Sequence, residues 1–479
     1  MNRTPLSMIA HWAAGELHGD ELHGDDVAIA SVGNDSRVSQ SGGLYVALRG
    51  ERFDGHEFAE DAVAHGAAAL LVDHPLAGVL VPQVVVADTQ LALAKIAAGL
   101  QQGRAGKVVA ITGSNGKTSV KTLLVSILQR VGNAYFNPGN RNNEIGLPLA
   151  VIDAPDDADF AVYEMGAGKP GDIAYLADVA RPDVALVNNI APAHLERMGN
   201  LLGVAQTKGA IYTALADDGV AVINADDAFA EYFAGLAGAA LAGSGRILRF
   251  GIDSSADVIA RDVRAGSVGS DFRLIAPQGE VRVSLKLPGR HNVLNALAAA
   301  SLALACGASL QAIAEGLAAA QPVAGRQIAH TLDPGVVLID DSYNANPGSL
   351  NAAIDTLAAG KGEAWLVLGD MRELGAEAGI LHADAGRRAK NAGIARLYAL
   401  GPLSAFAAQA FGEGSRVFAN HGELADALRA DLAVANSPVT ALVKGSRGSA
   451  MDRIVAALLA AANDNETGNG RGENTSHAA

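Results

Sequence analysis

A strand, a glycine loop and a helix follow one another in residues 107–131, and this order constrains the fold most. Val108 and Val109 belong to a short run typical of a buried strand. Gly113 and Gly116 follow, and apolar residues then recur at helical spacing at Val120, Leu123, Leu124, Ile127 and Val131. Glycines let backbone N–H groups approach an anion, and a helix N-terminus adds partial positive charge. The order therefore predicts a phosphate-binding turn between a strand and a helix.

The two residues that open this helix strengthen that interpretation. Lys117 can reach terminal phosphates as a point charge, and the hydroxyl of Thr118 can ligate Mg²⁺. The spacing departs from the general phosphate loop, because Ile111 stands where a first glycine is usual and Gly113 lies only three positions before Gly116. The alternative is a tight strand-to-helix turn that carries a surface lysine, but it leaves the joint placement of glycines, lysine and threonine unexplained.

Length and composition predict several α/β domains in a reducing compartment. A chain of 479 residues corresponds to roughly three domains, and only 4% of its residues are aromatic, as in sheets and helices packed with small side chains. The net charge of −15 argues against a general binder of nucleic acid or anionic membranes. Cys306 is the single cysteine, so no internal disulfide can form, and a buried inert thiol is expected.

No targeting or membrane segment is expected. The first fifteen residues lack a signal pattern, and no run reaches the ~18 apolar residues that span a bilayer. We therefore expect a cytoplasmic protein, with no membrane insertion and no nucleic-acid partner, and a monomer. The segment Glu-Leu-His-Gly-Asp occurs twice in residues 16–25, which indicates a duplicated surface turn more than a metal site.

Pattern changes divide the chain into four segments: 1–103, 104–325, 326–462 and a disordered tail at 463–479. The first is expected to be a smaller α/β domain. The second alternates strands and helices, as in a parallel sheet with a phosphate loop, and carries a small antiparallel insertion between about 247 and 287. The third is expected to be a doubly wound, Rossmann-like sheet. The fold class is therefore α/β with three domains.

Polar residues end several predicted strands, where open α/β sheets bind ligands. Glu164 ends the strand 160–164 beside the phosphate loop and is a candidate Mg²⁺ ligand, since Mg²⁺ prefers carboxylate, water and phosphate oxygens. The alternative is a capping or salt-bridged carboxylate. His194 follows the next strand, and in isolation it is as well explained as an ordinary loop histidine.

Two further clusters lie in the third segment. Residues 340–347 (DDSYNANP) end a strand with two acids and a tyrosine, more than a turn before a helix requires. Residues 444–448 (KGSRG) end the last strand, where backbone N–H groups with Lys444 and Arg447 can receive a carboxylate or a phosphate. The alternatives are a plain turn and a solvated basic turn.

The order of these motifs resembles the Mur ligases, the ATP-dependent amide-forming enzymes of peptidoglycan synthesis. The resemblance rests on the following segments: 112–118 (TGSNGKT), 140–148 (NRNNEIGLP), 164–167 (EMGA), 188–196 (NNIAPAHLE), 289–296 (GRHNVLNA) and 340–346 (DDSYNAN). Segments 369–375 (GDMRELG) and 443–447 (VKGSR) are most similar to the member that joins D-alanyl-D-alanine to UDP-N-acetylmuramoyl-tripeptide. The match covers nearly the whole chain apart from the tail.

The resemblance implies ATP and Mg²⁺ as cofactors and assigns roles by motif. Lys117 resembles the lysine on the β- and γ-phosphates, Thr118 and Glu164 the ligands of one Mg²⁺, and His194 the histidine near a second metal. Lys208 stands where the family has a lysine that can be carbamoylated to bridge metals, so Lys117, His194 and Lys208 are the implied catalytic residues. The implied nucleotide-binding residues are Gly113, Ser114, Asn115, Gly116, Lys117, Thr118, Ser119, Asn292, Asn295, Arg326 and Asp341.

The resemblance also implies two substrates, UDP-N-acetylmuramoyl-tripeptide and D-alanyl-D-alanine. The implied substrate residues are Ser36, Arg37, Asp54, His56, Asn142, Asn143, Lys444, Ser446 and Arg447. Three other classes remain open: a phosphate-loop kinase, a folylpolyglutamate-type or other amino-acid-adding ligase, and a non-catalytic nucleotide-binding module. A kinase does not need the clusters at 340–347 and 444–448. The third residue of the peptide, diaminopimelate or lysine, is left open.

Overall fold

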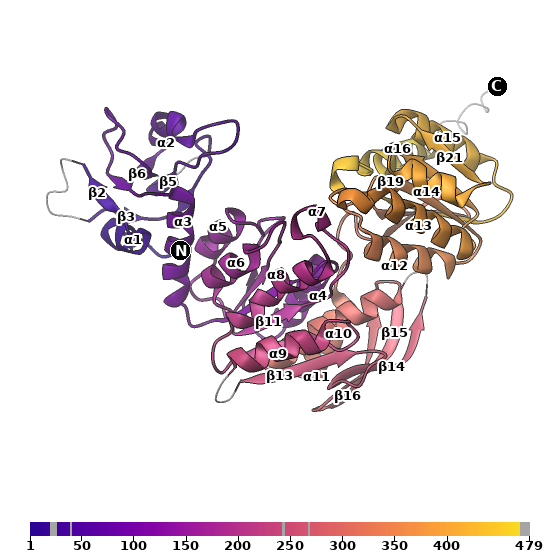
Figure 1. Ribbon diagram of the computed structural model, residues 1–479, viewed down its shortest axis with the longest axis horizontal. Helices are drawn as coiled ribbons and strands as arrows, with labels where there is room; N and C mark the ends of the chain where they lie inside the picture. Colours follow the sequence, from indigo (N-terminus) through magenta and orange to yellow (C-terminus); the bar gives the residue numbers. More distant parts are fainter. Residues whose placement is uncertain (20–25, 39–40, 242–244, 267–268, 470–479) are drawn as a thin grey trace, which may run out of the picture.

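Three α/β domains lie in series along the chain in the computed structural model (Figure 1). The structure describes residues 1–19, 26–38, 41–241, 245–266 and 269–469. The second copy of the repeated Glu-Leu-His-Gly-Asp segment, and the last residue of the first, lie outside these residues. The N-terminal and C-terminal domains lie at opposite ends of the molecule, with the central domain between them (Figure 1).

The N-terminal domain is a small sheet with helices. Its five-stranded sheet has the order β2 (Glu16–His18), β7 (Gln83–Val85), β6 (Ala67–Val72), β5 (Gly43–Val46) and β4 (Val32–Gly33). All neighbours pair in parallel except β2, which is antiparallel to β7. A two-stranded ribbon joins β1 (Thr4–Pro5) and β3 (Ala28–Ile29), and the helices are α1 (Leu6–Ala13), α2 (Ala59–Ala64) and α3 (Thr89–Gln102).

The central domain is built on one nine-stranded sheet. Its order is β16 (Gly279–Leu285), β15 (Ser270–Ala276), β14 (Val258–Ala265), β13 (Arg246–Gly251), β12 (Val220–Asn224), β11 (Val184–Val187), β8 (Lys107–Thr112), β10 (Phe160–Glu164) and β9 (Ala134–Phe136). The helices are α4 (Lys117–Leu128), α5 (Gly146–Asp153), α6 (Asp172–Ala180), α7 (Leu195–Met198), α8 (Leu201–Thr213), α9 (Ala230–Ala240), α10 (Arg290–Ala305) and α11 (Leu310–Ala319). Helices cover both faces of this sheet, with separate cores on each.

Two expectations for the central domain were wrong. The segment 247–287 is antiparallel from β14 through β15 to β16, as expected, but it is no separate insertion, because β13 and β14 pair in parallel with the main sheet and make it continuous. A periodic pattern shows strands but not which sheet they join. Val131 does not belong to the buried helix face, since α4 ends at Leu128 and the Val131 side chain is exposed. The other four apolar positions of that face are fully buried.

The C-terminal domain is a second, doubly wound sheet. Its order is β17 (Ile328–Asp333), β18 (Val336–Asp341), β22 (Val439–Lys444), β19 (Glu363–Gly369), β20 (Arg396–Leu400) and β21 (Ser415–Phe418), parallel except for β17. The helices α12 (Pro347–Ala358), α13 (Ala378–Asn391) and α14 (Ser404–Phe411) share one core cluster, while α15 (His421–Ala433) and α16 (Asp452–Asn469) border the other. Helix α16 continues through Asn469, so the segment predicted as a tail begins inside a helix, in keeping with the alanine-rich turns before it. Residues 470–479 lie outside the described residues.

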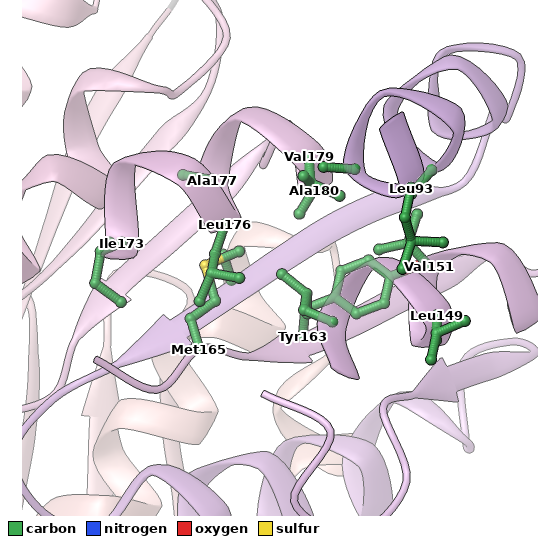
Figure 2. Close-up of a cluster of buried hydrophobic side chains, with 14 of the residues drawn as sticks. Leu93, Leu149, Val151, Tyr163, Met165, Ile173, Leu176, Ala177, Val179 and Ala180 are labelled. Atoms are coloured by element: carbon green, nitrogen blue, oxygen red, sulfur yellow. The ribbon is translucent and has the colours of Figure 1, made fainter. Parts of the chain in front are cut away.

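One apolar core joins the N-terminal and central domains. Helix α3 packs against α5 and α6 of the central domain, and a single cluster of buried side chains extends from Leu6 to Ala237. Figure 2 shows its middle, where Leu93 of α3 meets Val151 of α5 beside Tyr163 of β10. The Tyr163 hydroxyl also donates to the Gln101 side chain of α3, at 3.4 Å. These two domains therefore share one hydrophobic interior.

Candidate active site

A cavity of about 670 Å³ lies between the central and C-terminal domains. It forms where parallel strands of both sheets end: β8 and β10 in the central domain, and β18 and β22 in the C-terminal domain. Loops beyond the carboxyl ends of such strands are where α/β sheets bind ligands. The predicted site residues that line it are Ser114, Asn115, Gly116, Lys117, Thr118, Ser119, Asn142, Asn143, Glu164, His194, Asn292, Asn295, Arg326, Asp341 and Lys444.

The glycines of the loop after β8 are required by both conformation and space. Gly113 has φ +146° and Gly116 has φ +79°, values that side chains rarely allow. A Cβ at Gly116 would lie 2.4 Å from Oδ1 of Asn295, and one at Gly113 would lie 3.0 Å from Cβ of Asn188. The Asn188 amide donates to the Asn115 carbonyl and to Asn295 Oδ1, both at 3.0 Å. The loop is thus held in an open cradle by α10 and the end of β11.

Lys117, Thr118 and Glu164 come together at the start of α4, as the sequence predicts. Lys117 Nζ donates to the Gly113 carbonyl at 2.8 Å, and the Thr118 hydroxyl donates to Glu164 Oε2 at 2.9 Å. Arg326, from the segment entering the C-terminal domain, donates to the same hydroxyl at 2.9 Å. Burial lowers the pKa of Lys117, and the Glu164 carboxylate opposes that shift. The cluster pairs anion-binding groups with one carboxylate.

Glu164 is ionised although it is buried. Asn142 donates to its Oε1 at 3.1 Å, and Lys121 lies 3.3 Å from its Oε2. Burial raises the pKa of Glu164, but Lys121, Lys117 and the Thr118 hydroxyl together bring it below its usual value. A buried carboxylate beside the Thr118 hydroxyl offers the hard oxygen ligands that Mg²⁺ takes.

His194 and Lys208 differ in their surroundings. His194 lines the cavity, and its Nδ1 contacts the carboxylate of Glu373 from the C-terminal domain. Burial lowers the pKa of His194 more than Glu373 raises it. Lys208 is buried on α8 but is not one of the residues that line the cavity. Burial, with the nearby charge of Lys117, lowers the pKa of Lys208 to about 7.

The residues predicted in the C-terminal domain are mostly engaged with one another. Lys444 Nζ lies 2.6 Å from Asp341 Oδ2, and both residues are buried. Burial raises the pKa of Asp341, and the Lys444 charge opposes that shift. The Ser446 hydroxyl donates to the Ala345 carbonyl at 3.0 Å. Arg447 is exposed, with its guanidinium 5.6 Å from the centre of the Tyr343 ring.

The residues predicted in the N-terminal domain do not line this cavity. Arg37 pairs with Asp35 at 2.8 Å in an exposed turn, next to the buried Ser36. Asp54 accepts from the His56 backbone N–H at 3.0 Å and contacts His56 Nδ1 at 2.5 Å. These residues form a second polar area on a separate domain.

His56 also belongs to a group of potential metal ligands with Asp73 and His74. Its two ring nitrogens are already engaged, Nδ1 with Asp54 and Nε2 with the Asp73 backbone N–H at 3.1 Å. Arg49 lies 2.8 Å from the Asp73 carboxylate and supplies a cation there. A hydrogen-bonded ion network explains this group without a metal.

Three buried polar atoms beside the cavity have no hydrogen-bond partner among the residues described. Within the part of the chain that the structure describes, Asn188 Oδ1, Arg326 Nε and Gln327 Oε1 make no hydrogen bond. Arg326 and Gln327 line the cavity, and Asn188 bonds to two residues that do. Buried donors and acceptors are rarely left unpaired. The side chains that carry these atoms are therefore left partly unsatisfied by the contacts within the described residues.

Four residues of the site received no role from the sequence, although two of them, Asn346 and Glu373, belong to motifs singled out there. Lys121 lies one helical turn after Lys117, and a lysine on the apolar face of α4 is the signal that could have indicated it. Asn346 donates to the Asn115 side chain at 2.7 Å across the two domains. Glu373 carries no signal in spacing, because its partner His194 lies on a distant segment, and no pattern in the sequence marks Gln327. Both have positive φ, +62° and +57°, which the sequence does not reveal.

Comparisons with known proteins agree with this geometry. Residues 28–100 match the Mur ligase family catalytic domain, residues 111–303 the Mur ligase middle domain, and residues 302–447 the Mur ligase glutamate ligase domain. The chain is 44% identical to the UDP-N-acetylmuramoyl-tripeptide--D-alanyl-D-alanine ligase of Escherichia coli, over 92% of this chain and 96% of that protein.

Solved structures show the same similarity. A crystal structure of MurF from Acinetobacter baumannii has a TM-score of 0.90 and 33% identity, covering 96% of this chain and 100% of its own. MurF ligase of Thermotoga maritima in complex with ADP has a TM-score of 0.81 and 26% identity, covering 91% and 98%. The chain therefore belongs to the Mur ligase family.

Proposed function

We propose that this protein is an ADP-forming ligase that joins D-alanyl-D-alanine to UDP-N-acetylmuramoyl-tripeptide in peptidoglycan precursor synthesis. The observation that carries the proposal is the cavity in which the phosphate loop and Glu164 of the central domain meet Arg326 and Asp341 at the C-terminal domain. The names of the relatives that match over nine-tenths of the chain support the choice of substrates.

The chemistry requires ATP because a carboxylate is a poor acylating agent. The substrate carboxylate attacks the γ-phosphorus of ATP, ADP leaves, and the resulting acyl phosphate then reacts with the amine of the dipeptide to release phosphate. Phosphoryl transfer needs neutralisation of charge at the phosphate oxygens. Lys117, the backbone N–H groups at the start of α4 (residues 116–118) and Arg326 supply donors for it, whereas the N–H groups of Ser114 and Asn115 already donate to Asn189. The ADP complex of the Thermotoga maritima ligase supports the use of ATP.

We propose that Thr118 and Glu164 hold Mg²⁺, with His194 and Lys208 at a second metal. Mg²⁺, when bound, neutralises charge on the phosphates. The ionised, buried Glu164 beside the Thr118 hydroxyl fits such an ion. A lysine with a pKa of about 7 is partly neutral at physiological pH, so Lys208 can add to CO₂ with loss of a proton and become a carbamate.

The other substrates are assigned to the outer domains. Ser36, Arg37, Asp54 and His56 would hold the uridine end on the N-terminal domain, and Asn142 and Asn143 would lie toward the peptide. Lys444, Ser446 and Arg447 would hold the dipeptide. Within that last group Arg447 is the exposed cation, whereas Lys444 is paired with Asp341. We infer that Arg447 binds the dipeptide carboxylate and that Lys444 fixes the turn.

Coupled phosphate release tests the function. The expected result is release of ADP and phosphate only when the UDP-linked tripeptide and D-alanyl-D-alanine are both present, with diaminopimelate and lysine tripeptides compared side by side. Turnover with a folate and glutamate, or with a single amino acid in place of the dipeptide, would favour another ligase of the family. ATP consumption with neither second substrate would contradict the proposal.

The magnesium assignment has its own test. Glu164→Gln keeps the size of the side chain and removes its charge, so the Mg²⁺ concentration for half-maximal turnover should rise sharply. An unchanged Mg²⁺ titration would return Glu164 to a structural role.

None of the helices in the described part of the chain is long and apolar enough to cross a membrane. A monomer in the cytoplasm stays a prediction.

A further inference from the structure

Residues 369–375 form a rigid loop that projects from the C-terminal domain toward the central one. The loop leaves β19 at Gly369 and reaches a short 3₁₀ turn, η2 (Gly375–Glu377). Asp370 Oδ1 accepts from the Ser404 backbone N–H at 2.7 Å and from its hydroxyl at 3.0 Å. The Met371 N–H donates to Nε2 of the buried His382 at 2.9 Å. The first half of the loop is therefore fixed from within its own domain.

The second half of the loop is anchored at the turn after β22. The Arg372 N–H donates to the Ser446 hydroxyl at 2.9 Å, and the Ser446 N–H donates to the Asp370 carbonyl at 3.0 Å. Leu374 is buried in the C-terminal core. Glu373 lies between the exposed Arg372 and the buried Leu374, and its side chain is 59% exposed.

Glu373 meets His194 across the two domains. Its carboxylate contacts Nδ1 of His194, and its backbone carbonyl accepts from the Glu196 N–H at 3.4 Å. Both residues of the pair are in the left-handed region, Glu373 with φ +62° and His194 with φ +54°. Non-glycine residues adopt this conformation at a cost in energy, and only when the surrounding structure imposes it. The backbone of both segments is therefore shaped to make this contact.

A carboxylate at Nδ1 determines which ring nitrogen of the imidazole carries the proton. An ionised carboxylate only accepts hydrogen bonds, so Nδ1 must carry the proton, and in the neutral ring the lone pair is then on Nε2. Such a partner is the usual means by which proteins orient a metal-binding or proton-accepting histidine. Both side chains are partly exposed, so the pair contributes little to stability and its effect is orientation.

We propose that Glu373 is a positioning residue: from the C-terminal domain it fixes the ring and tautomer of His194 in the central domain, and presents Nε2 as an acceptor toward the cavity. Because the two residues belong to different domains, His194 is set only while the domains are docked. The tautomer part stands on the structure alone, and its use at a metal site rests on the proposed function.

The first test reads the tautomer directly. In protein with ¹⁵N-labelled histidine, the His194 signals, assigned by their loss in His194→Gln, should show a protonated Nδ1 and an unprotonated Nε2. Glu373→Ala should shift the ring toward the Nε2–H form, which neutral histidine otherwise favours. Glu373→Gln keeps an accepting oxygen and should retain the wild-type tautomer. Glu377→Gln, an exposed carboxylate on the following turn, is the matched control and should leave the signals unchanged.

The second test uses Mn²⁺ as the probe, in the presence of ADP, with free metal measured by electron paramagnetic resonance. Glu373→Ala should weaken Mn²⁺ binding about tenfold, as loss of such a partner does elsewhere, whereas Glu377→Gln should not. An unchanged tautomer in Glu373→Ala overturns the proposal, even if turnover falls, because the residue would then act only in docking.

The outcomes separate the two proposals. If Glu373→Ala changes the tautomer but the wild-type protein makes no ligated product, the proposed function fails and the positioning role stands. If wild-type protein is active and Glu373→Ala leaves tautomer and Mn²⁺ affinity unchanged, the positioning role fails and the function stands. Should Glu373→Ala not fold, Glu373→Lys is measured instead, because it also removes the acceptor, and a retained Nδ1–H tautomer there overturns the proposal.

Discussion

The central domain meets its two neighbours in opposite ways. Toward the N-terminal domain it shares one continuous apolar core, in which Leu93 of α3 packs with Val151 and Tyr163 (Figure 2). Toward the C-terminal domain the described residues share no core cluster, because the two C-terminal clusters begin at Leu338 and Ala345. Polar contacts connect them instead, among them Arg326 with Thr118, Asn346 with Asn115 and Glu373 with His194.

The apolar junction with the N-terminal domain contributes stability, whereas the polar junction with the C-terminal domain holds the cavity. Burial of apolar surface stabilises in proportion to its area, so the first junction holds its two domains as one body. Hydrogen bonds exchanged with water contribute little net free energy, so the second junction can open and close at small cost. The cavity lies at the second junction. Groups from both domains can therefore come together around a substrate and separate again.

Lys117→Ala should show the largest effect and concerns the polar junction. Removing one donor to a transferring phosphoryl group typically costs about 10²–10³-fold in turnover. The thermal unfolding midpoint should change little, because Lys117 is half-buried at the cavity, lies outside the described core clusters, and has a desolvation cost that its removal ends. Steady-state kinetics and calorimetry measure the two quantities. Near-normal activity in a folded variant would refute the ATP site.

Leu93→Ala should give the reverse result at the apolar junction. Truncation of a fully buried leucine costs about 2–5 kcal/mol of unfolding free energy. The KM values of the folded variant should stay unchanged, since Leu93 does not line the cavity. Leu91→Ala, on the same helix but 46% exposed, is the control and should change stability by less than about 0.5 kcal/mol. Equal losses in both variants would argue against a shared core.

Arg447→Ala should have a smaller effect, confined to one substrate. Loss of a charge-assisted hydrogen bond at an exposed position is expected to raise the KM for D-alanyl-D-alanine about tenfold, while the KM for ATP stays nearly constant. Arg387→Ala, an exposed arginine on α13, serves as the control. A rise in the ATP KM with an unchanged dipeptide KM would make the turn after β22 a phosphate site.

Closure of the C-terminal domain on the central domain when ATP binds should give the smallest measured change. It tests directly whether the polar junction moves while the apolar junction stays fixed. With a non-hydrolysable ATP analogue, the radius of gyration should fall toward the value of about 23 Å that a compact chain of this length has. The distance between labels on the N-terminal and central domains should stay constant, while that between the central and C-terminal domains shortens. Identical scattering with and without the analogue, or movement at the first junction, would contradict this view.

Much of the fold could be predicted from local pattern. The strands at Phe160–Glu164 and Val220–Asn224 begin and end where alternation and apolar runs indicate. Connections between distant segments could not be predicted in this way. Strands β13 and β14 extend the central sheet from β12, and a local pattern shows a strand but not the sheet it joins. The end of α4 at Leu128 depends on a turn that periodicity does not show.

The residues of the site likewise fall into two groups: those that local pattern predicts, and those whose contacts join distant segments. Lys117, Thr118 and Glu164 could be placed together from the sequence, because parallel strands bring their carboxyl ends to one edge. The pairing of Lys444 with Asp341 and that of His194 with Glu373 join residues more than a hundred positions apart. Spacing carries no information on such pairs, so these contacts become visible only in the structure.

The shared core has a consequence for how the protein is made. The apolar face of α3 is complete once residue 102 is synthesised, but the helices that cover it, α5 and α6, end at Asp153 and Ala180. A chain emerging from the ribosome therefore carries this face uncovered until about 80 further residues have followed. During that interval the first domain lacks part of its core, and its exposed apolar surface is of the kind that promotes aggregation during folding.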